Sequence, residues 1–264
     1  MPELPEVEVM RRYFSAAVEG QQIVRVSFHD PLDKIFKSPR EALEKALTGA
    51  RFGETQRIGK YFFAHIANGP WLHLHFGMTG DLVLYRGNEL PKYTRFSFHF
   101  QSGQNLAFCD LRKFGVIQLT DDPLAFVKEL SLGPDLLKIN PEDFSHRLRR
   151  GKVAIKTALL DQKRVAGIGN WIADEMLFDC ALHPLTPAEK ISKEQAQQLW
   201  ESGRAIVEQA IAEDTHYGAF PAGFFVHYRK GGALHPEYPD SPVEKLTVGG
   251  RGTYIVPARQ KAGN

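Results

Sequence analysis

The sequence has little cysteine and no long apolar run. Its 264 residues include only two cysteines, Cys109 and Cys180, too few for the disulfide framework of a small secreted domain. No run of about 18 apolar residues is present, and no basic region followed by an apolar stretch opens the chain. We therefore expect neither a membrane span nor a secretory signal, and we expect a protein of the reducing cytoplasm.

An excess of charge of one sign is also lacking, because 33 Lys and Arg face 31 Asp and Glu, for a net charge of +2. The charges are distributed unevenly along the sequence. Between Ser145 and Arg164 the only acid is Asp161, whereas the cations of this stretch are Arg147, Arg149, Arg150, Lys152, Lys156, Lys163 and Arg164. Such a basic stretch can bind phosphates, and it can equally be a solvated helix face, so both interpretations remain open at this point.

Periodicity divides the chain into a β-rich first part and a helical second part. Val7, Met10, Phe14 and Val18 recur at near-helical spacing, and Gly20 suits the helix end. Alternating runs rich in aromatic residues follow at 61–66, 71–76, 81–85, 95–100 and 106–110, and most of the breaks between them contain Gly, Asn or Pro. This pattern predicts an N-terminal helix plus a β-sandwich over residues 1–134.

Helical periodicity begins after SLGPDLL at 131–137. We expect a helix at 155–162, the tight loop RVAGIGN, and a second helix with Asn170 as its N-cap. Ser192 and Gln195 predict a capping box for a longer helix. From His216 onward, short strands and glycines predict a β-hairpin. The expected plan is a multi-domain α and β protein with a helical domain over 135–215 and a hairpin domain over 216–264.

The amino terminus combines prolines with acids. Initiator methionine is commonly removed before a small residue, which would leave Pro2 with a secondary amine. An α-amino group titrates at about 7.7–8.0, so part of it is unprotonated at neutral pH and can attack a sugar carbon to give an iminium ion. Glu3 is the nearest acid or base. The same residues also suit a helix start, and this segment alone leaves both interpretations open.

Several turn residues could contact nucleic acid. Lys60 begins an aromatic strand, where a lysine is usually a solvated edge residue. Met78 lies in a turn flanked by glycines, and Arg112 and Phe114 lie beside the turn glycine of DLRKFG. Exposed apolar side chains on turns can insert into a base stack, although each of these residues also fits an ordinary core or surface position.

A glycine loop and a histidine pair complete the candidates. AGIGN at 166–170 frees backbone N–H groups before a helix, which favours anion binding, although tight helix–helix turns also need glycine. His73 and His75 share one strand face and could chelate a metal in a hydrolase. Two distant cysteines cannot complete a zinc ribbon. We expect no metal and no cofactor.

Taken in order, these motifs resemble the formamidopyrimidine-DNA glycosylase / endonuclease VIII family of base-excision repair enzymes. The motifs are PELPEVE (2–8), GKY (59–61), HFGMTG (75–80), DLRKFG (110–115), LLDQKRVAGIGNWIADEMLF (159–178) and HP (183–184), and they span nearly the whole chain. The resemblance implies a monomeric, cofactor-free DNA glycosylase and AP lyase that excises oxidised bases through an N-terminal proline Schiff base, followed by β,δ-elimination. Its partner would be double-stranded DNA containing oxidised bases or abasic sites, with no membrane involved. Its location would be the nucleoid of a bacterium or the nucleus of a eukaryote.

The resemblance also assigns residue roles. The catalytic residues would be Pro2, Glu3, Lys60 and Arg251. Glu6 and Glu175 would be supporting carboxylates, Glu6 in a buried position. The residues on DNA phosphates would be His75, Arg95, Lys152, Lys156 and Asn170. Met78, Arg112 and Phe114 would intercalate where the damaged nucleotide leaves the stack. The helices around AGIGN would form a helix–two-turn–helix.

The sequence departs from the family pattern in three places. No cysteine follows Cys180, so the segment ending in GGRGTYIVP resembles the zincless finger, a two-strand hairpin that carries Arg251. Arg95 stands where bacterial members have a phosphate-contacting histidine, and we expect it to replace that residue. Residues 214–223 are shorter than the loop that closes over 8-oxoguanine. The resemblance therefore implies weak or altered 8-oxoguanine excision, with formamidopyrimidines and hydantoins as better substrates.

A different class of function is a non-catalytic damaged-DNA-binding protein on the same scaffold. Such a protein would be expected to lose the N-terminal proline, its neighbouring acid or the lysine, and Pro2, Glu3 and Lys60 are all present.

Overall fold

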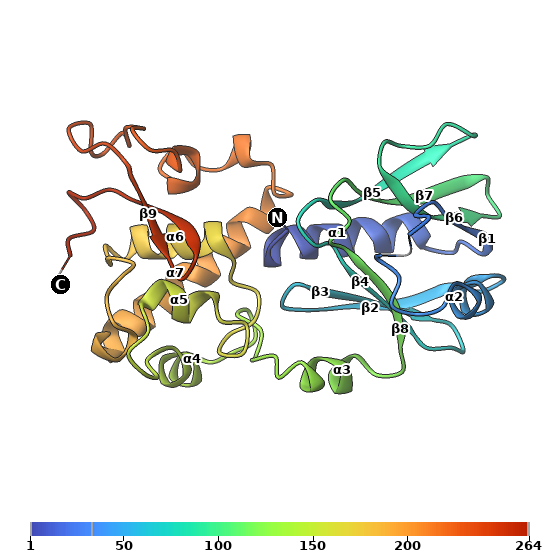
Figure 1. The fold of residues 1–264 in the computed structure, drawn as a ribbon, viewed down its shortest axis with the longest axis horizontal. Coiled ribbons are helices and arrows are strands. Elements are labelled where there is room, and N and C mark those ends of the chain that lie inside the picture. Colours follow the sequence, from blue (N-terminus) through green and yellow to red (C-terminus); the bar gives the residue numbers. More distant parts are fainter. Residues whose placement is uncertain (1, 33, 263–264) are drawn as a thin grey trace. The chain divides into compact units, whose positions relative to one another are not determined.

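The structure, a computed structural model, describes residues 2–32 and 34–262. Internal contacts divide the chain into two compact units, and the division falls within the first helix. The β unit contains Pro2 and Glu6–Leu130, and the helical unit contains Glu3–Pro5 and the chain from Ser131 onward (Figure 1). The C-terminal hairpin belongs to the helical unit. The separate hairpin domain expected over 216–264 and the boundary at residue 134 remain predictions.

The β unit consists of two four-stranded antiparallel sheets, ordered β1-β6-β7-β5 and β2-β3-β4-β8. Its strands are β1 (Ile23–Phe28), β2 (Phe52–Ile58), β3 (Tyr61–Ile66), β4 (Trp71–His75), β5 (Gly80–Arg86), β6 (Thr94–Phe100), β7 (Gln104–Asp110) and β8 (Val116–Thr120). Its helices are α1 (Leu4–Val18), most of which lies in this unit, α2 (Arg40–Leu47) and α3 (Pro123–Glu129). The predicted N-terminal helix and β-sandwich are confirmed.

Strands β1, β2 and β8 were not predicted from the sequence, and all three lie at sheet edges. An edge strand has one edge without a neighbouring strand and often carries polar residues there. These polar residues hide the alternation of apolar and polar side chains by which a half-buried strand is recognised. β2, with the sequence FGETQRI, has one buried residue, Arg57, and the rest are half-buried or exposed. The pattern revealed the four central strands and one edge strand, β5.

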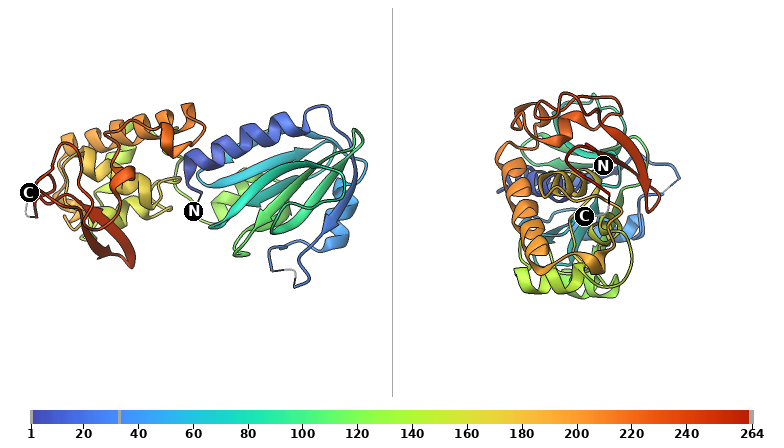
Figure 2. Two further views of the ribbon diagram at one scale, coloured as in Figure 1. Left: turned by 90° about the horizontal axis from the view of Figure 1, so that it is seen from above. Right: turned by 90° about the vertical axis from the view of Figure 1, so that its left-hand side faces the viewer.

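The core of the β unit lies between α1 and the inner faces of both sheets. Val7, Phe14 and Val18 are buried, as the helical spacing predicted. The Phe14 ring lies 5.0 Å from that of Phe62 and 6.2 Å from that of Phe98, which belong to different sheets. Figure 2 shows α1 running along the strands of this unit. Aromatic side chains on α1 therefore join the two sheets into one core.

The helical unit contains α4 (Pro141–Leu148), α5 (Ile155–Leu160), α6 (Asn170–Asp179), α7 (Lys193–Ala212) and the hairpin β9 (Glu244–Val248) and β10 (Arg251–Ile255). The capping box of Ser192 and Gln195 at the start of α7 is confirmed. Leu4 is fully buried in the core of this unit. Residues 225–228 form a short 3-10 helix, so the expectation of strands throughout the C-terminal segment is wrong there. Within the described ranges, no helix is both long and apolar enough to cross a membrane.

Candidate functional site

In the helical unit, Glu3 caps helix α6. Its side chain is only 2% exposed, and its carboxylate accepts the N–H groups of Trp171 at 3.0 Å and Ile172 at 3.3 Å. Asn170 was predicted as the N-cap, and this prediction is wrong, because Asn170 is the first helical residue and Gly169 before it makes no side-chain cap. The anion at this helix N-terminus is therefore supplied by the chain itself.

The glycines of AGIGN make room for the N-terminal segment. A Cβ on Gly169 would lie 2.0 Å from the Glu3 Cδ atom, and one on Gly167, whose φ is +109°, would lie 2.4 Å from a methyl carbon of Leu4. The Leu4 N–H group donates to the Gly167 carbonyl at 3.3 Å. This loop therefore binds residues 3 and 4 and fixes the position from which Pro2 extends.

Pro2 directly precedes Glu3 and is half-buried. Met1, whose removal the sequence analysis expects, lies outside the described residues. The chemistry of the Pro2 nitrogen therefore remains an expectation from sequence, but its neighbour Glu3 has a defined position.

Asn170 and Lys156 share one acceptor in the C-terminal hairpin. The Asn170 Nδ2 atom donates to the Gly252 carbonyl at 3.0 Å, and the Lys156 ammonium donates to the same carbonyl at 3.3 Å. Gly252 follows Arg251, so these two side chains hold the hairpin beside α5 and α6. The structure thus brings together Lys156, Asn170 and Gly252, which lie in separate motifs of the sequence.

Lys156 differs from the expectation of a phosphate-binding surface residue. Its side chain is fully buried, and its ammonium lies 2.5 Å from Asp174 Oδ1. Arg229 pairs with the other oxygen of that carboxylate at 2.8 Å. Asp174 and Arg229 were not identified from the sequence, and buried charges of this kind are found in such compensating clusters. As described, Lys156 supports the hairpin, and a role on phosphate would require a change in this cluster.

Glu175 secures the segment that leads to the hairpin. Its carboxylate accepts the N–H groups of Phe225 and Val226, both at 2.7 Å. Burial raises the pKa of Glu175 to about 7, even though these two N–H groups favour the ionised form. The Phe225 ring stacks on Phe178 of α6, with ring centres 4.6 Å apart. Glu175, predicted from the sequence as a supporting acid, thus holds the backbone at residues 225 and 226.

Arg251, the first residue of β10, is an exposed cation of the helical unit. Arg251 lines a pocket of about 300 Å³ together with Thr157 and Arg164. Arg164 donates to the carbonyl groups of Leu148 and Arg150, which fixes the turn before Lys152. Lys152 itself is exposed. Arg164 of the basic stretch therefore stabilises the fold, whereas Lys152 of the same stretch and Arg251 of the hairpin are exposed to solvent.

In the β unit, Asp110 joins the two loops that carry Met78, Arg112 and Phe114. Asp110 is fully buried, and its carboxylate accepts the Thr79 hydroxyl at 2.5 Å and the Gly115 N–H group at 2.7 Å. It also accepts the Arg112 N–H group at 3.1 Å. One carboxylate thus fixes the end of the Met78 loop and both ends of the loop that carries Arg112 and Phe114.

Gly77 lets these loops touch. A Cβ at Gly77 would lie 2.4 Å from the Phe114 carbonyl carbon, and its φ of +58° also favours glycine. The three side chains point outward: Met78 is 36% and Phe114 53% exposed, and the Arg112 guanidinium lies 4.9 Å from the Phe114 ring centre. The sequence-predicted wedge residues therefore lie on adjacent, rigidly connected loops.

The positive charge of Lys60 influences the protonation of His75. Burial lowers the pKa of His75, and the positive charge of Lys60 lowers it further, so the imidazole is neutral at pH 7. Its Nδ1 atom accepts the Gly77 N–H group at 3.1 Å. A neutral imidazole that accepts at Nδ1 carries its proton on Nε2, which leaves Nε2–H as a donor.

His73 is a packing residue. One of its ring nitrogens, Nδ1, lies 3.0 Å from the Phe62 carbonyl, and its ring stacks on Tyr61 at 5.4 Å. Burial lowers its pKa to about 3. Across residues 2–32 and 34–262, no group of three or more His, Cys, Asp or Glu side chains is arranged to hold a metal ion. These contacts give no support to the metal-hydrolase interpretation.

The turn that carries Lys60 depends on Glu8, which sequence reasoning missed. The Glu8 carboxylate accepts from Arg11 at 2.7 Å and from Arg57 at 3.2 Å. Arg57 in turn donates to the Gly59 carbonyl at 2.9 Å. Burial raises the pKa of Glu8, but the hydrogen bonds and charges of these arginines outweigh it and hold the pKa at about 2. Glu6, expected to be buried, is only half-buried.

Arg95 is half-buried on β6, and its Nε atom donates to the Asp110 carbonyl at 2.8 Å. It therefore lies against the residue that organises the wedge loops. Its predicted contact with a DNA phosphate remains a prediction.

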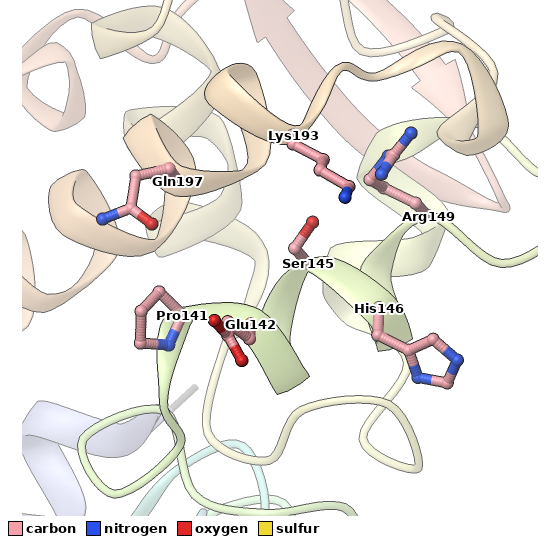
Figure 3. A pocket seen from close by; sticks show the side chains of 7 residues that line it. All are labelled: Pro141, Glu142, Ser145, His146, Arg149, Lys193 and Gln197. Carbon is pink, nitrogen blue, oxygen red and sulfur yellow. The ribbon is translucent and has the colours of Figure 1, made fainter.

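A pocket of about 600 Å³ lies apart from all of these residues, between α4 and α7 (Figure 3). It is lined by Pro141, Glu142, Ser145, His146, Arg149, Lys193 and Gln197. None of the sequence-predicted site residues lines it, and its size alone gives it no chemical role.

Comparison with known proteins matches both units. Residues 1–117 match the family model of the formamidopyrimidine-DNA glycosylase N-terminal domain, and residues 130–219 match that of the formamidopyrimidine-DNA glycosylase H2TH domain. The chain is 32% identical to formamidopyrimidine-DNA glycosylase of Arabidopsis thaliana, over 99% of this chain and 71% of the relative. It is 33% identical to the enzyme of the same name from Bacillus licheniformis, over 99% and 100%.

Solved structures match over the same extent. The formamidopyrimidine-DNA glycosylase of Lactococcus lactis, bound to DNA containing an abasic site, superposes with a TM-score of 0.88 at 28% identity, over 98% of this chain and 100% of that one. A structure of MutM with DNA containing carbocyclic 8-oxoguanine superposes with a TM-score of 0.87, also at 28% identity and over the same shares.

Proposed function

The chain belongs to the formamidopyrimidine-DNA glycosylase family, and we propose that it removes oxidised bases from DNA through an N-terminal Pro2 amine. The observation that carries the proposal is the fixed position of Glu3. A buried carboxylate, held by two backbone N–H groups, directly follows the proposed nucleophile in the chain. An amine and an oriented acid in adjacent positions are the pair that imine chemistry requires.

The proposed reaction consists of base loss followed by two eliminations. The Pro2 nitrogen attacks C1′ of the damaged nucleotide, the bond from C1′ to the base breaks, and the base leaves with a proton. Glu3 transfers protons during base loss and sugar-ring opening. The resulting iminium ion acidifies C2′, so loss of a C2′ proton expels the 3′ phosphate, and a second elimination expels the 5′ phosphate. Lys60 and Arg251 assist these eliminations.

Access to C1′ requires rotation of the nucleotide out of the duplex, which costs a few kcal/mol of unstacking. Met78, Arg112 and Phe114 would occupy the space it leaves, because they are exposed on loops that Asp110 holds rigid. His75 Nε2–H, Lys152, Asn170 and Arg95 would bind phosphates. Lys156 would act mainly through the hairpin that it supports.

We further propose that formamidopyrimidines and hydantoins are better substrates than 8-oxoguanine. Residues 214–223 are short, and within them Tyr217 and Phe220 pack against Trp171, with ring centres 5.9 and 6.0 Å away. A loop packed in this way leaves little chain to close over an everted base. Single-turnover excision rates on the three lesions test this, and 8-oxoguanine removal as fast as that of formamidopyrimidine would exclude it.

The decisive experiment is borohydride trapping on duplex DNA that contains an abasic site or an oxidised base. We expect a covalent adduct from protein lacking Met1, as checked by intact mass. The adduct should disappear when the N-terminal amine is blocked by acetylation, which removes the nucleophile, and it should persist in Pro5→Ala, the matched proline control. Binding of damaged DNA without any adduct would instead favour a non-catalytic damaged-DNA-binding protein.

A further inference from the structure

Two strands of the β unit carry the same five-residue pattern. RVSFH at 25–29 runs through β1, and RFSFH at 95–99 lies in β6, so each contains Arg-x-Ser-x-His. Alternation along a strand places the Arg, Ser and His of each copy on one face, opposite the buried phenylalanines. β1 and β6 are antiparallel neighbours, with Arg25 opposite His99 and Ser27 opposite Ser97. The two copies therefore lie head to tail.

Polar side chains of the two copies contact one another across the strand pair. Ser27 Oγ lies 2.8 Å from Arg25 Nη1, which donates to it, and 2.9 Å from His99 Nε2. In the other half of the repeat, Ser97 Oγ lies 3.2 Å from His29 Nε2. Each serine hydroxyl thus contacts the histidine of the opposite strand, which fixes both imidazole rings.

The row extends across the whole sheet. His99 lies opposite Asn105 of β7, and their side chains are 2.8 Å apart. Asn105 in turn lies opposite Tyr85 of β5. Arg25, His99, Asn105 and Tyr85 therefore come from four neighbouring strands and occupy successive positions on one face.

A pocket of about 410 Å³ lies over this row and is lined by Arg25, Ser27, His29, Tyr85, His99 and Asn105, among others. None of its described lining residues is an acid. The Tyr85 hydroxyl oxygen is buried there and has no hydrogen-bond partner within residues 2–32 and 34–262. A buried hydroxyl without a partner is uncommon in folded proteins and requires an explanation, such as a missing ligand.

The electrostatics of the pocket also favour an anion. The charged or titratable groups that face it are Arg25 from β1, His29 directly after β1, His99 from β6 and Tyr85 from β5. Burial lowers the pKa of both histidines, and the charge of Arg25 lowers each further. A bound anion would remove this mutual repulsion and would favour protonated imidazoles.

We propose that this β1–β6 pocket binds a phosphate-type oxyanion, carried either by a free phosphate ester or by the DNA backbone. The Arg25 guanidinium, the His29 Nδ1–H group and the Tyr85 hydroxyl are the donors. His99, whose two ring nitrogens contact Ser27 and Asn105, contributes positive charge when it is protonated. The pocket contains none of the residues assigned to base removal, so the proposal stands independently of the proposed function.

The test follows the imidazole NMR signals of His29 and His99 in the full chain during titration with inorganic phosphate, a nucleoside 5′-monophosphate or undamaged duplex DNA. We expect saturable shifts and an affinity about tenfold higher near pH 6 than near pH 8, because binding takes up protons. A response to the small phosphates alone identifies a free ligand. A response to duplex DNA that Arg25→Gln reduces identifies backbone phosphate. Either result supports an oxyanion site.

Variants separate this site from general charge effects. Arg25→Gln should weaken binding about tenfold or more, whereas Arg86→Gln, an exposed arginine on β5 outside the pocket, should leave it unchanged. Tyr85→Phe removes a hydroxyl that makes no hydrogen bond to any described residue, so it should weaken phosphate binding without lowering the melting temperature. Absence of saturable shifts, or equal weakening by the Arg25 and Arg86 variants, would overturn the proposal.

Discussion

The Trp171 N–H group donates to the Glu3 carboxylate at 3.0 Å, across 168 residues of sequence. This contact makes a residue near the N-terminus the cap of helix α6, whose own preceding residue, Gly169, has no side chain to do so. Capping is therefore compatible with the proposed catalytic role of Glu3, because the helix N–H groups fix the carboxylate of the residue that follows Pro2 in the chain.

Gly169→Ala should disrupt this arrangement. The new Cβ would lie 2.0 Å from the Glu3 Cδ atom, which forces the carboxylate off the helix. We expect a loss of about 1–3 kcal/mol in the free energy of unfolding and a large loss of base excision. Denaturant unfolding and single-turnover excision measure both. Gly218→Ala, which meets no atom within 4 Å, is the control and should be close to neutral.

Asp110→Asn should loosen the wedge loops. An amide cannot accept the Thr79 hydroxyl, the Arg112 N–H group and the Gly115 N–H group together, because one of its two positions is a donor. We expect at least tenfold weaker binding to lesion-containing duplex and slower nucleotide eversion, as followed by a fluorescent base next to the lesion. Asp121→Asn, at an exposed position, should change neither.

Glu8→Gln should affect Lys60 through Arg57. Loss of the carboxylate charge weakens the interaction that positions Arg57, and Arg57 in turn holds the Gly59 carbonyl next to Lys60. Because Lys60 is proposed to assist elimination, elimination should slow more than base release. Separate gel assays of base loss and strand cleavage measure the two steps. Glu19→Gln, exposed beyond the end of α1, is the matched control. Equal slowing of both steps would contradict a role through Lys60.

The same carboxyl predicts a loss of stability in acid. The pKa of Glu8 is about 2 in the folded protein against an ordinary 4.5, so its contribution is present above about pH 4.5 and is lost as the pH falls towards 2. After allowance for solvent screening, we expect the wild type to lose about 2 kcal/mol more than Glu8→Gln over this range. Unfolding by denaturant at several pH values measures it.

Glu175 predicts the opposite trend nearer neutrality. Its pKa is raised from 4.5 to about 7 by burial, so the stability contributed by its protonated form is present below pH 4.5 and is lost as the pH rises through 7. Relative to Glu175→Gln, the free energy of unfolding of the wild type should fall by about 2–3 kcal/mol between these values. Parallel pH profiles for the two proteins would show that Glu175 does not titrate in this range.

The sequence by itself determined the family motifs, the N-terminal helix and the central strands. These features are local: an apolar residue at every third or fourth position, or at every second position, is visible wherever one face of an element is buried. The edge strands β1, β2 and β8 escaped because their polar residues hide that contrast, whereas the edge strand β5 keeps it in DLVLY. The exposed wedge residues were also identifiable, since glycine-flanked turns with large side chains stand out in the sequence.

Only the tertiary structure decided which polar groups meet. Glu3 rather than Asn170 caps α6, Lys156 is buried against Asp174 rather than exposed, and Glu8, to which the sequence assigned no role, pairs with Arg57. A hydrogen bond or ion pair depends on two groups that are distant in sequence and close in space, and no local pattern specifies the second partner. The prolines and acids of the first segment were visible from the start, but their roles depended on a loop more than 160 residues away.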